Sequence, residues 1–107
     1  MMRLMIMFDL PTDTAAERKE YRQFRKALIN EGFLMIQFSV YERVCVTRQT
    51  ANFLEKRIRK FMPSKGVVQS LMVTEKQYSD MHFLVGDAVK DIRNTSCLLY
   101  TSPSPRD

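Results

Sequence analysis

The sequence predicts an α+β fold in which two helices cover one face of a single antiparallel sheet. Three observations support this prediction. Two segments have apolar residues at helical spacing, four short segments are rich in apolar, β-branched and aromatic residues, and these segments follow one another in the order β-α-β-β-α-β. With 107 residues, of which 45% are hydrophobic and 27% charged, the chain is long enough for one domain with one core.

The first predicted strand runs from Arg3 to Asp9 and is almost entirely apolar. Pro11 stops it, because proline cannot donate to a strand ladder. Asp9 stands at the end of this strand and has two interpretations. It is either a turn residue whose side chain bonds its own backbone, or a metal ligand that holds a divalent cation against phosphate.

The first predicted helix begins after Thr14. This residue and Glu17 form a capping box, in which each side chain satisfies a free amide of the first turn. Tyr21, Phe24 and Leu28 then recur at helical spacing and give the helix one apolar face. Gly32 is predicted to end the helix in the left-handed conformation.

Residues 33–46 are rich in β-branched and aromatic side chains, and the polar interruption around Ser39 divides them into two strands joined by a tight bend or bulge. A second helix is expected from about Thr50. Leu54, Ile58 and Phe61 form its apolar face, and Pro63 ends it.

After a turn at Lys65-Gly66, residues 67–74 are predicted to form the fourth strand, residues 75–79 a short helical turn, and residues 81–85 a short extended piece. This order is that of the ferredoxin-like split βαβ arrangement. Both helices then cover one face of the sheet and leave the other face open and largely apolar. Such a face predicts a homodimer in which two sheets pack together.

The basic residues gather in the two predicted helices. A formal net charge of +5 and a pI near 9.5 favour a polyanionic partner. The alternative is that these residues form ordinary solvated helix faces, whose charge is eased by neighbouring glutamates. The residues predicted to bind nucleic acid are Arg18, Lys19, Arg22, Arg25, Lys26, Lys56, Arg59 and Lys60.

Several other functions lack a motif. Cys45 and Cys97 are far apart and no histidines cluster, which argues against a zinc site or a disulfide framework and favours a reducing, cytoplasmic setting. No apolar run approaches the roughly 18 residues that a membrane span needs. The glycines are too widely spaced to form a phosphate-binding loop, and His82 is expected to be a structural or surface residue.

The opening segment, from Met2 through Phe8-Asp9-Leu10-Pro11 to Thr14, resembles the first strand and turn of the CRISPR-associated small adaptation endonuclease family. Members of this family are the compact partners of the CRISPR integrase. Residues 32–41, which include Gln37 and Ser39, are similar to the strand pair of that family. Residues 73–78 and 84–86 are similar to its type II-like branch, and the resemblance extends from Met2 to about Asn94.

The resemblance implies a ferredoxin-like homodimer that binds duplex DNA together with the CRISPR integrase during spacer acquisition. It also implies a Mg²⁺-dependent endonuclease, a phosphodiesterase acting on RNA or DNA, in which Asp9 is both the metal ligand and the catalytic residue. Mg²⁺ needs only one or two carboxylates besides water and substrate phosphate, so two Asp9 side chains at a twofold axis would suffice. A purely non-catalytic nucleic-acid-binding scaffold is the main alternative. A ligand-sensing ferredoxin-like regulator is a weaker one, because no glycine-bearing ligand loop is present.

The C-terminal segment, residues 97–107, reads as the one-frame translation of a widely used transposon sequencing adapter. We interpret it as an artefactual, disordered tail that should be left out of reasoning about the fold. Residues 1–96 then form a single ferredoxin-like domain. The resemblance implies a further native strand that pairs with the partner subunit, and we expect this strand to be missing here and the dimer to be weaker as a result.

Overall fold

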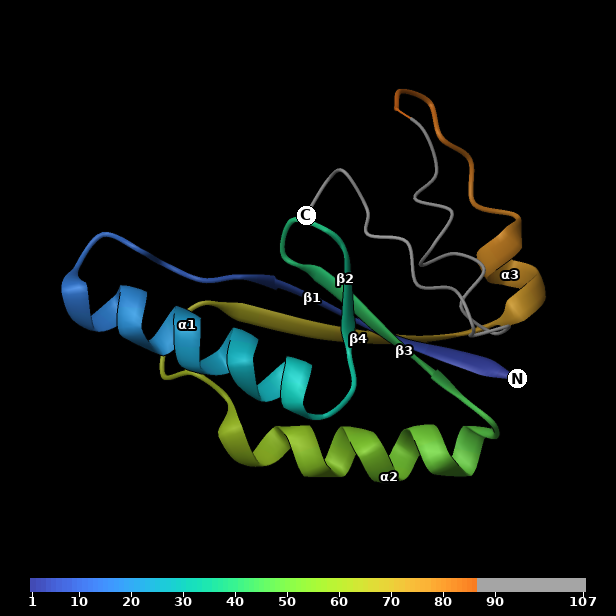
Figure 1. Ribbon diagram of the computed structural model, residues 1–107, viewed down its shortest axis with the longest axis horizontal. Helices are drawn as coiled ribbons and strands as arrows, with labels where there is room; N and C mark the ends of the chain where they lie inside the picture. Colours follow the sequence, from blue (N-terminus) through green and yellow to red (C-terminus); the bar gives the residue numbers. More distant parts are fainter. Residues whose placement is uncertain (87–107) are drawn as a thin grey trace.

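The computed structural model describes residues 1–86, and its elements confirm the predicted order (Figure 1). The expectations about a last strand and about residues 97–107 lie outside the described residues. No helix within residues 1–86 is long and apolar enough to cross a membrane. The elements are β1 (Met2–Asp9), α1 (Ala15–Asn30), β2 (Leu34–Gln37), β3 (Val40–Cys45), α2 (Arg48–Ile58), the 3₁₀ turn η1 (Arg59–Phe61), β4 (Val67–Thr74) and α3 (Glu75–Ser79).

The four strands form one antiparallel sheet in the order β2-β3-β1-β4, which confirms the ferredoxin-like topology. β1 is a central strand. It pairs with β4 along its whole length, from Met2 opposite Thr74 to Asp9 opposite Val67, and with β3 from Met2 to Met7. At Asp9 itself only β4 continues the pairing, so β4 is the strand that positions this residue.

The ends of α1 have the predicted geometry. Thr14 Oγ1 accepts a hydrogen bond of 3.1 Å from the Glu17 amide, and Glu17 Oε1 accepts one of 3.0 Å from the Thr14 amide. At the other end, Gly32 has a φ of +89°, the left-handed conformation that glycine adopts most readily. Arg43 of β3 adds a hydrogen bond of 2.7 Å to the carbonyl of Glu31, the C-cap residue.

The bend between β2 and β3 lies at Ser39, which has a φ of 61°. The register also shifts between Met35 and Gln37, so that the predicted bend and bulge are both present. The Ser39 carbonyl accepts a hydrogen bond of 3.1 Å from the Phe8 amide, which joins the bend to the end of β1. Beyond the bend, Tyr41 and Glu42 are buried within β3.

The predicted apolar role of Phe61 is confirmed: it packs against the core, from the 3₁₀ turn η1 just before Pro63. Two local predictions were wrong. α2 begins at Arg48 and not near Thr50, because Thr47 is the N-cap and its Oγ1 accepts a 3.1 Å hydrogen bond from the Thr50 amide. Residues 81–85 form no strand and follow α3 as irregular chain.

The core lies between the sheet and the two long helices (Figure 1). Leu4, Ile6 and Phe8 project from β1 into it, and the Phe8 ring packs edge-to-face on Phe24 of α1 with centroids 5.0 Å apart. Because side chains alternate along a strand, the odd-numbered residues of β1 project from the opposite face. We call this opposite face, which α1 and α2 do not cover, the open face.

Candidate metal site and nucleic-acid surfaces

Asp9 is the last residue of β1, and its side chain is exposed on the open face. Within residues 1–86, its carboxylate forms no hydrogen bond and no ion pair. The structural interpretation, in which the side chain bonds its own backbone, therefore has no support in this geometry. The carboxylate is free to meet a group from outside the described chain.

Gly66 fixes the backbone at this position. It has a φ of +91°, and a Cβ atom placed on it would lie 2.6 Å from the Asp9 carbonyl oxygen and 2.8 Å from Leu10 Cδ2. Real Cβ atoms do not approach backbone oxygens this closely, so the turn before β4 fits against Asp9 only when it carries glycine. Asp9 is consequently held on a rigid strand end even though its side chain is exposed.

The open face carries several exposed apolar residues. Val67 lies directly opposite Asp9 in the register and is 56% exposed, and Leu71 on the same strand is 50% exposed. Leu34 of β2 and Phe38 at the bend are 45% and 80% exposed. An apolar surface of this kind beside a carboxylate is typical of a face that packs against a partner.

The far end of the open face is not open, because α3 folds over it (Figure 1). Thr74 caps this short helix: its Oγ1 accepts a 3.1 Å hydrogen bond from the Gln77 amide, and Gln77 Oε1 accepts one of 2.9 Å from the Thr74 amide. The cap turns the chain back over β1 directly after β4. Tyr78 of α3 is buried as a result.

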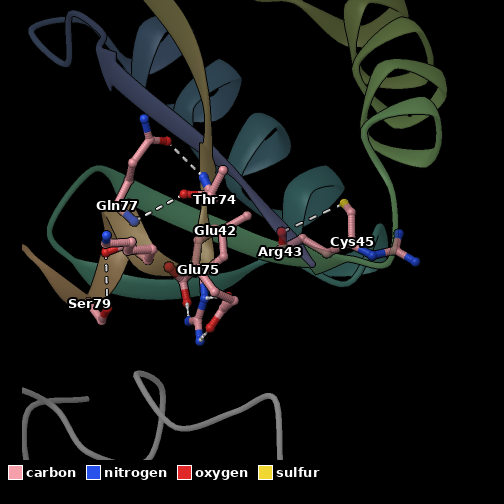
Figure 2. Close-up of polar contacts among 9 residues, drawn as sticks. Glu42, Arg43, Cys45, Thr74, Glu75, Gln77 and Ser79 are labelled. Carbon is pink, nitrogen blue, oxygen red and sulfur yellow. Dashed lines mark hydrogen bonds and ion pairs between the residues drawn. The ribbon is translucent and has the colours of Figure 1, made fainter.

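A buried arginine fastens α3 to the sheet. Arg3 is fully buried, and it donates to Glu42 of β3 at 2.6 Å and to Glu75 of α3 at 2.5 Å. These two glutamates are labelled in Figure 2. The Tyr78 ring lies 4.1 Å from the Arg3 guanidinium carbon, a cation–π distance. Sequence reasoning missed this cluster, because Arg3 and Glu75 are 72 residues apart in the chain.

Burial and charge pairing shift the pKa values of Glu42 and Arg3. Burial raises the pKa of Glu42, and the nearby Arg3 only partly opposes this effect. Burial alone would lower the pKa of Arg3, but its hydrogen bonds and charge interactions with Glu75 and Glu42 raise it. Two carboxylates thus share one permanently charged guanidinium. The pKa of Glu42 is raised even though Arg3 lies beside it.

All eight basic residues predicted to bind nucleic acid are exposed, but their surroundings differ. Arg59 forms an ion pair of 3.0 Å with Glu55, and Arg18 donates to the carbonyls of Thr12 and Asp13. Arg25 lies beside the Tyr41 hydroxyl, where it partly offsets the rise in the Tyr41 pKa that burial causes. The remaining residues have no ion pair with any carboxylate in residues 1–86, and they are Lys19, Arg22, Lys26, Lys56 and Lys60.

The structure does not bring Asp9 and the basic residues onto one surface. The basic residues lie on α1, α2 and η1, which cover one face of the sheet, whereas Asp9 projects from the other face (Figure 1). Nucleic acid lying across the helices of one subunit would therefore not reach that subunit's Asp9 without passing around the edge of the sheet. Binding and cleavage are separable in this geometry.

A divalent cation fits Asp9 only if other ligands join it. Within residues 1–86, no group of three or more histidine, cysteine, aspartate and glutamate side chains could hold a metal ion. Mg²⁺ tolerates such a sparse site, because it keeps several waters and often takes one or two carboxylates together with substrate phosphate. The free carboxylate of Asp9 is of the required type, and a second copy of the chain could supply another.

The family model for "CRISPR associated protein Cas2" matches residues 2–81, which include every element from β1 to α3. The chain belongs to the Cas2 family. The resemblance seen in the opening segment and in the strand pair is thereby confirmed.

Curated relatives in the Cas2 family are named "CRISPR-associated endoribonuclease Cas2". The protein of Ligilactobacillus salivarius is 68% identical over 95 residues, covering 89% of this chain and 94% of the relative. That of Lacticaseibacillus rhamnosus is 60% identical with the same coverage, and that of Streptococcus mutans UA159 is 45% identical over 92% of this chain and 90% of the relative.

A solved structure supports the fold. The crystal structure of Streptococcus pyogenes Cas2 at pH 6.5 aligns with a TM-score of 0.57, covering 79% of this chain and 100% of that chain. At 21% identity this likeness concerns the fold alone. It agrees with the α+β, ferredoxin-like architecture of the described residues.

Proposed function

We propose that this Cas2-family chain forms a twofold homodimer through its open face and hydrolyses phosphodiester bonds of RNA or DNA at a site shared by the two Asp9 carboxylates. The observation that carries the proposal is the free Asp9 carboxylate, held by Gly66 at the edge of an exposed apolar surface. The endoribonuclease names of the relatives support a nuclease and favour RNA as a substrate.

Asp9 from each subunit would bind Mg²⁺ in this proposal. The bound ion would neutralise phosphate charge and lower the pKa of a coordinated water. The chain itself contributes the position of the carboxylates, which the β1–β4 pairing and Gly66 fix. The apolar residues around Asp9 contribute by excluding bulk water when the two open faces meet, which strengthens the attraction between carboxylate and cation.

A second function is supported by the opposite surface. The unpaired Lys19, Arg22 and Lys26 follow one another along α1, and Lys56 and Lys60 follow along α2 and η1. We propose that these residues bind the phosphates of duplex DNA, in the cytoplasm and together with the CRISPR integrase during spacer acquisition. Because this surface is remote from Asp9, a scaffold without catalysis remains possible on the same fold, whereas family membership leaves a ligand-sensing regulator without support.

The catalytic proposal is tested by Asp9→Asn, which keeps the shape of the side chain and removes its charge. The matched control is Asp13→Asn, because Asp13 is also exposed and its carboxylate forms no contact within residues 1–86. We expect Mg²⁺-stimulated cleavage of a labelled RNA to be lost in Asp9→Asn and retained in Asp13→Asn. Full metal-stimulated cleavage by Asp9→Asn would rule out the proposed role, and the protein would then be a scaffold.

A further inference from the structure

Phe53 is a large aromatic residue on the outer side of α2, with 65% of its surface exposed. Its neighbour Leu54 is buried against the sheet, as is Ile58 one turn later, so that Phe53 points away from the core. A single exposed apolar residue is ordinary on a protein surface and needs no explanation by itself. The basic side chains next to Phe53 suggest a function for it.

Phe53 lies in a row of exposed basic residues, of which Arg57, four residues further on, is paired with Glu31 at 3.0 Å. Lys56 and Lys60 follow it at spacings of three and seven, which places all three on one side of the helical segment. Neither lysine has an ion pair within residues 1–86. We call Phe53, Lys56 and Lys60 the α2 stripe.

The nearest acidic side chain on this helix is turned away from the α2 stripe. Glu55 accepts a hydrogen bond of 2.6 Å from Ser70 of β4 and forms the ion pair with Arg59. These contacts lower its pKa, led by the hydrogen bond from Ser70, and keep it ionised on the sheet side of the helix. A ligand bound at the α2 stripe could therefore contact an aromatic ring and two lysines that have no ion pair within residues 1–86.

We propose that the α2 stripe binds unpaired nucleotides, with Phe53 stacking on a base and the two lysines contacting the flanking phosphates. The inference rests on the nucleic-acid binding proposed above and adds unpaired nucleotides to the duplex DNA proposed for the same two lysines. Charge complementarity points to a polyanion. The exposed aromatic ring selects the single-stranded form, because a base inside a duplex offers no free face for stacking, whereas an unpaired base does.

Three variants separate stacking from charge. Phe53→Ala removes the ring and no charge, so binding of a single strand should weaken about 5- to 150-fold, the effect of losing one stacked base. The salt dependence should stay the same. Phe53→Tyr should bind as the wild type does. Lys56→Gln should instead reduce the slope of log affinity against log salt by about 0.7, because one phosphate contact to a single strand is lost.

The control variant is Ile29→Ala on α1. Ile29 is also an exposed apolar residue, at 45%, and it lies near the free Lys26 on its own helix, but it has no ring to stack. Its substitution should leave binding of a single strand unchanged. Phe53→Ala should unfold at the same urea concentration as the wild type, because an exposed side chain contributes little to the core.

The experiment measures fluorescence anisotropy with a labelled oligouridine and with a labelled DNA duplex at fixed salt. Phe53→Ala should lose affinity for oligouridine and keep its affinity for the duplex, and 5-iodouridine in the oligonucleotide should crosslink to Phe53. Unchanged oligouridine affinity would overturn the inference. So would an equal loss for both nucleic acids, or a loss confined to binding of a protein partner.

The inference and the proposed catalysis can fail independently. The oligouridine assay measures binding without cleavage, and the α2 stripe lies on the other side of the sheet from Asp9. Asp9→Asn should bind oligouridine as tightly as the wild type. A result against Asp9 therefore leaves the α2 stripe in place, and a result against Phe53 leaves the Asp9 site in place.

Discussion

Gly66 touches the backbone of Asp9 so closely that a methyl group on it would lie 2.6 Å from the Asp9 carbonyl oxygen. The contact joins the turn before β4 to the end of β1, the two places that meet beside the candidate metal ligand. An exposed side chain can bind a metal well only if its backbone does not move. Gly66 provides this rigidity.

Gly66→Ala should destabilise the protein and disturb Asp9. Gly86 is a matched control, because it also has a φ of +91° but no atom of residues 1–86 lies within 4 Å of its potential Cβ. Both substitutions carry the cost of a left-handed alanine, about 1–3 kcal/mol. Only Gly66→Ala adds the clash with Asp9, which costs about 1–3 kcal/mol more.

Urea unfolding of the two glycine variants measures this difference. Gly66→Ala should also lower metal-stimulated cleavage at temperatures where it remains folded, whereas Gly86→Ala should not. Equal unfolding free energies for the two variants would contradict the close packing of Gly66 on Asp9.

Arg3→Met should be strongly destabilising. The side chain of Glu42 is 2% exposed, so removal of Arg3 leaves a buried carboxylate without its cation. A broken buried ion pair of this type costs about 3–5 kcal/mol. The double variant Arg3→Met with Glu42→Leu replaces the pair with apolar groups and should recover most of the loss in urea unfolding. A double variant no more stable than Arg3→Met would show that the pair is not the source of the effect.

The raised pKa of Glu42 makes stability depend on pH in a known direction. In the unfolded chain this carboxyl titrates near its ordinary pKa of 4.5, and in the folded chain it titrates at higher pH. Folding therefore takes up a proton between these two values. The contribution of Glu42 is complete below the unfolded pKa and is lost as pH rises through the folded pKa.

Glu42→Gln cannot ionise and serves as the reference for this effect. We expect the stability of the wild type relative to Glu42→Gln to be greatest in acid, to fall as the pH rises above about 4.5, and then to level off. Urea unfolding of both proteins across this pH range provides the measurement. A difference that rises with pH would mean that Arg3 lowers the pKa of Glu42 more than burial raises it.

Neighbouring residues on η1 should contribute unequally to nucleic-acid binding. Lys60 has no ion pair among the described residues, whereas Arg59 is paired with Glu55 at 3.0 Å. Lys60→Gln should reduce the slope of log affinity against log salt for duplex DNA by about 0.9, the value for one lost phosphate contact. Arg59→Gln should change it less. Equal changes would show that Arg59 leaves Glu55 to bind phosphate.

The sequence predicted the parts of the fold that depend on local chemistry. The Thr14 cap, the Gly32 terminus and the bend at Ser39 each involve residues close together in the chain, and all three are present. Family membership was also predictable, because the motif around Asp9 is contiguous. The start of α2 was missed because Thr47 and Thr50 are both good caps, and only the three-dimensional structure shows which one is used.

The relationships between distant segments could not be predicted. Arg3 and Glu75 are 72 residues apart, and nothing in either segment indicates that α3 folds back over the sheet. The contact between Gly66 and Asp9 likewise depends on the pairing of β1 with β4. The basic helices and Asp9 lie on opposite faces because the even-numbered residues of β1 face the helices and the odd-numbered ones do not. The sequence alone does not show this, since both sets include apolar residues.

The most direct test of the shared Asp9 site is a subunit-mixing experiment. Wild-type and Asp9→Asn chains are unfolded together, refolded in equal amounts, and assayed for Mg²⁺-stimulated cleavage of RNA. If both carboxylates of a twofold dimer are required, random pairing should leave about a quarter of the wild-type activity. If each Asp9 acts alone, about half should remain, and that result would contradict a site shared between subunits.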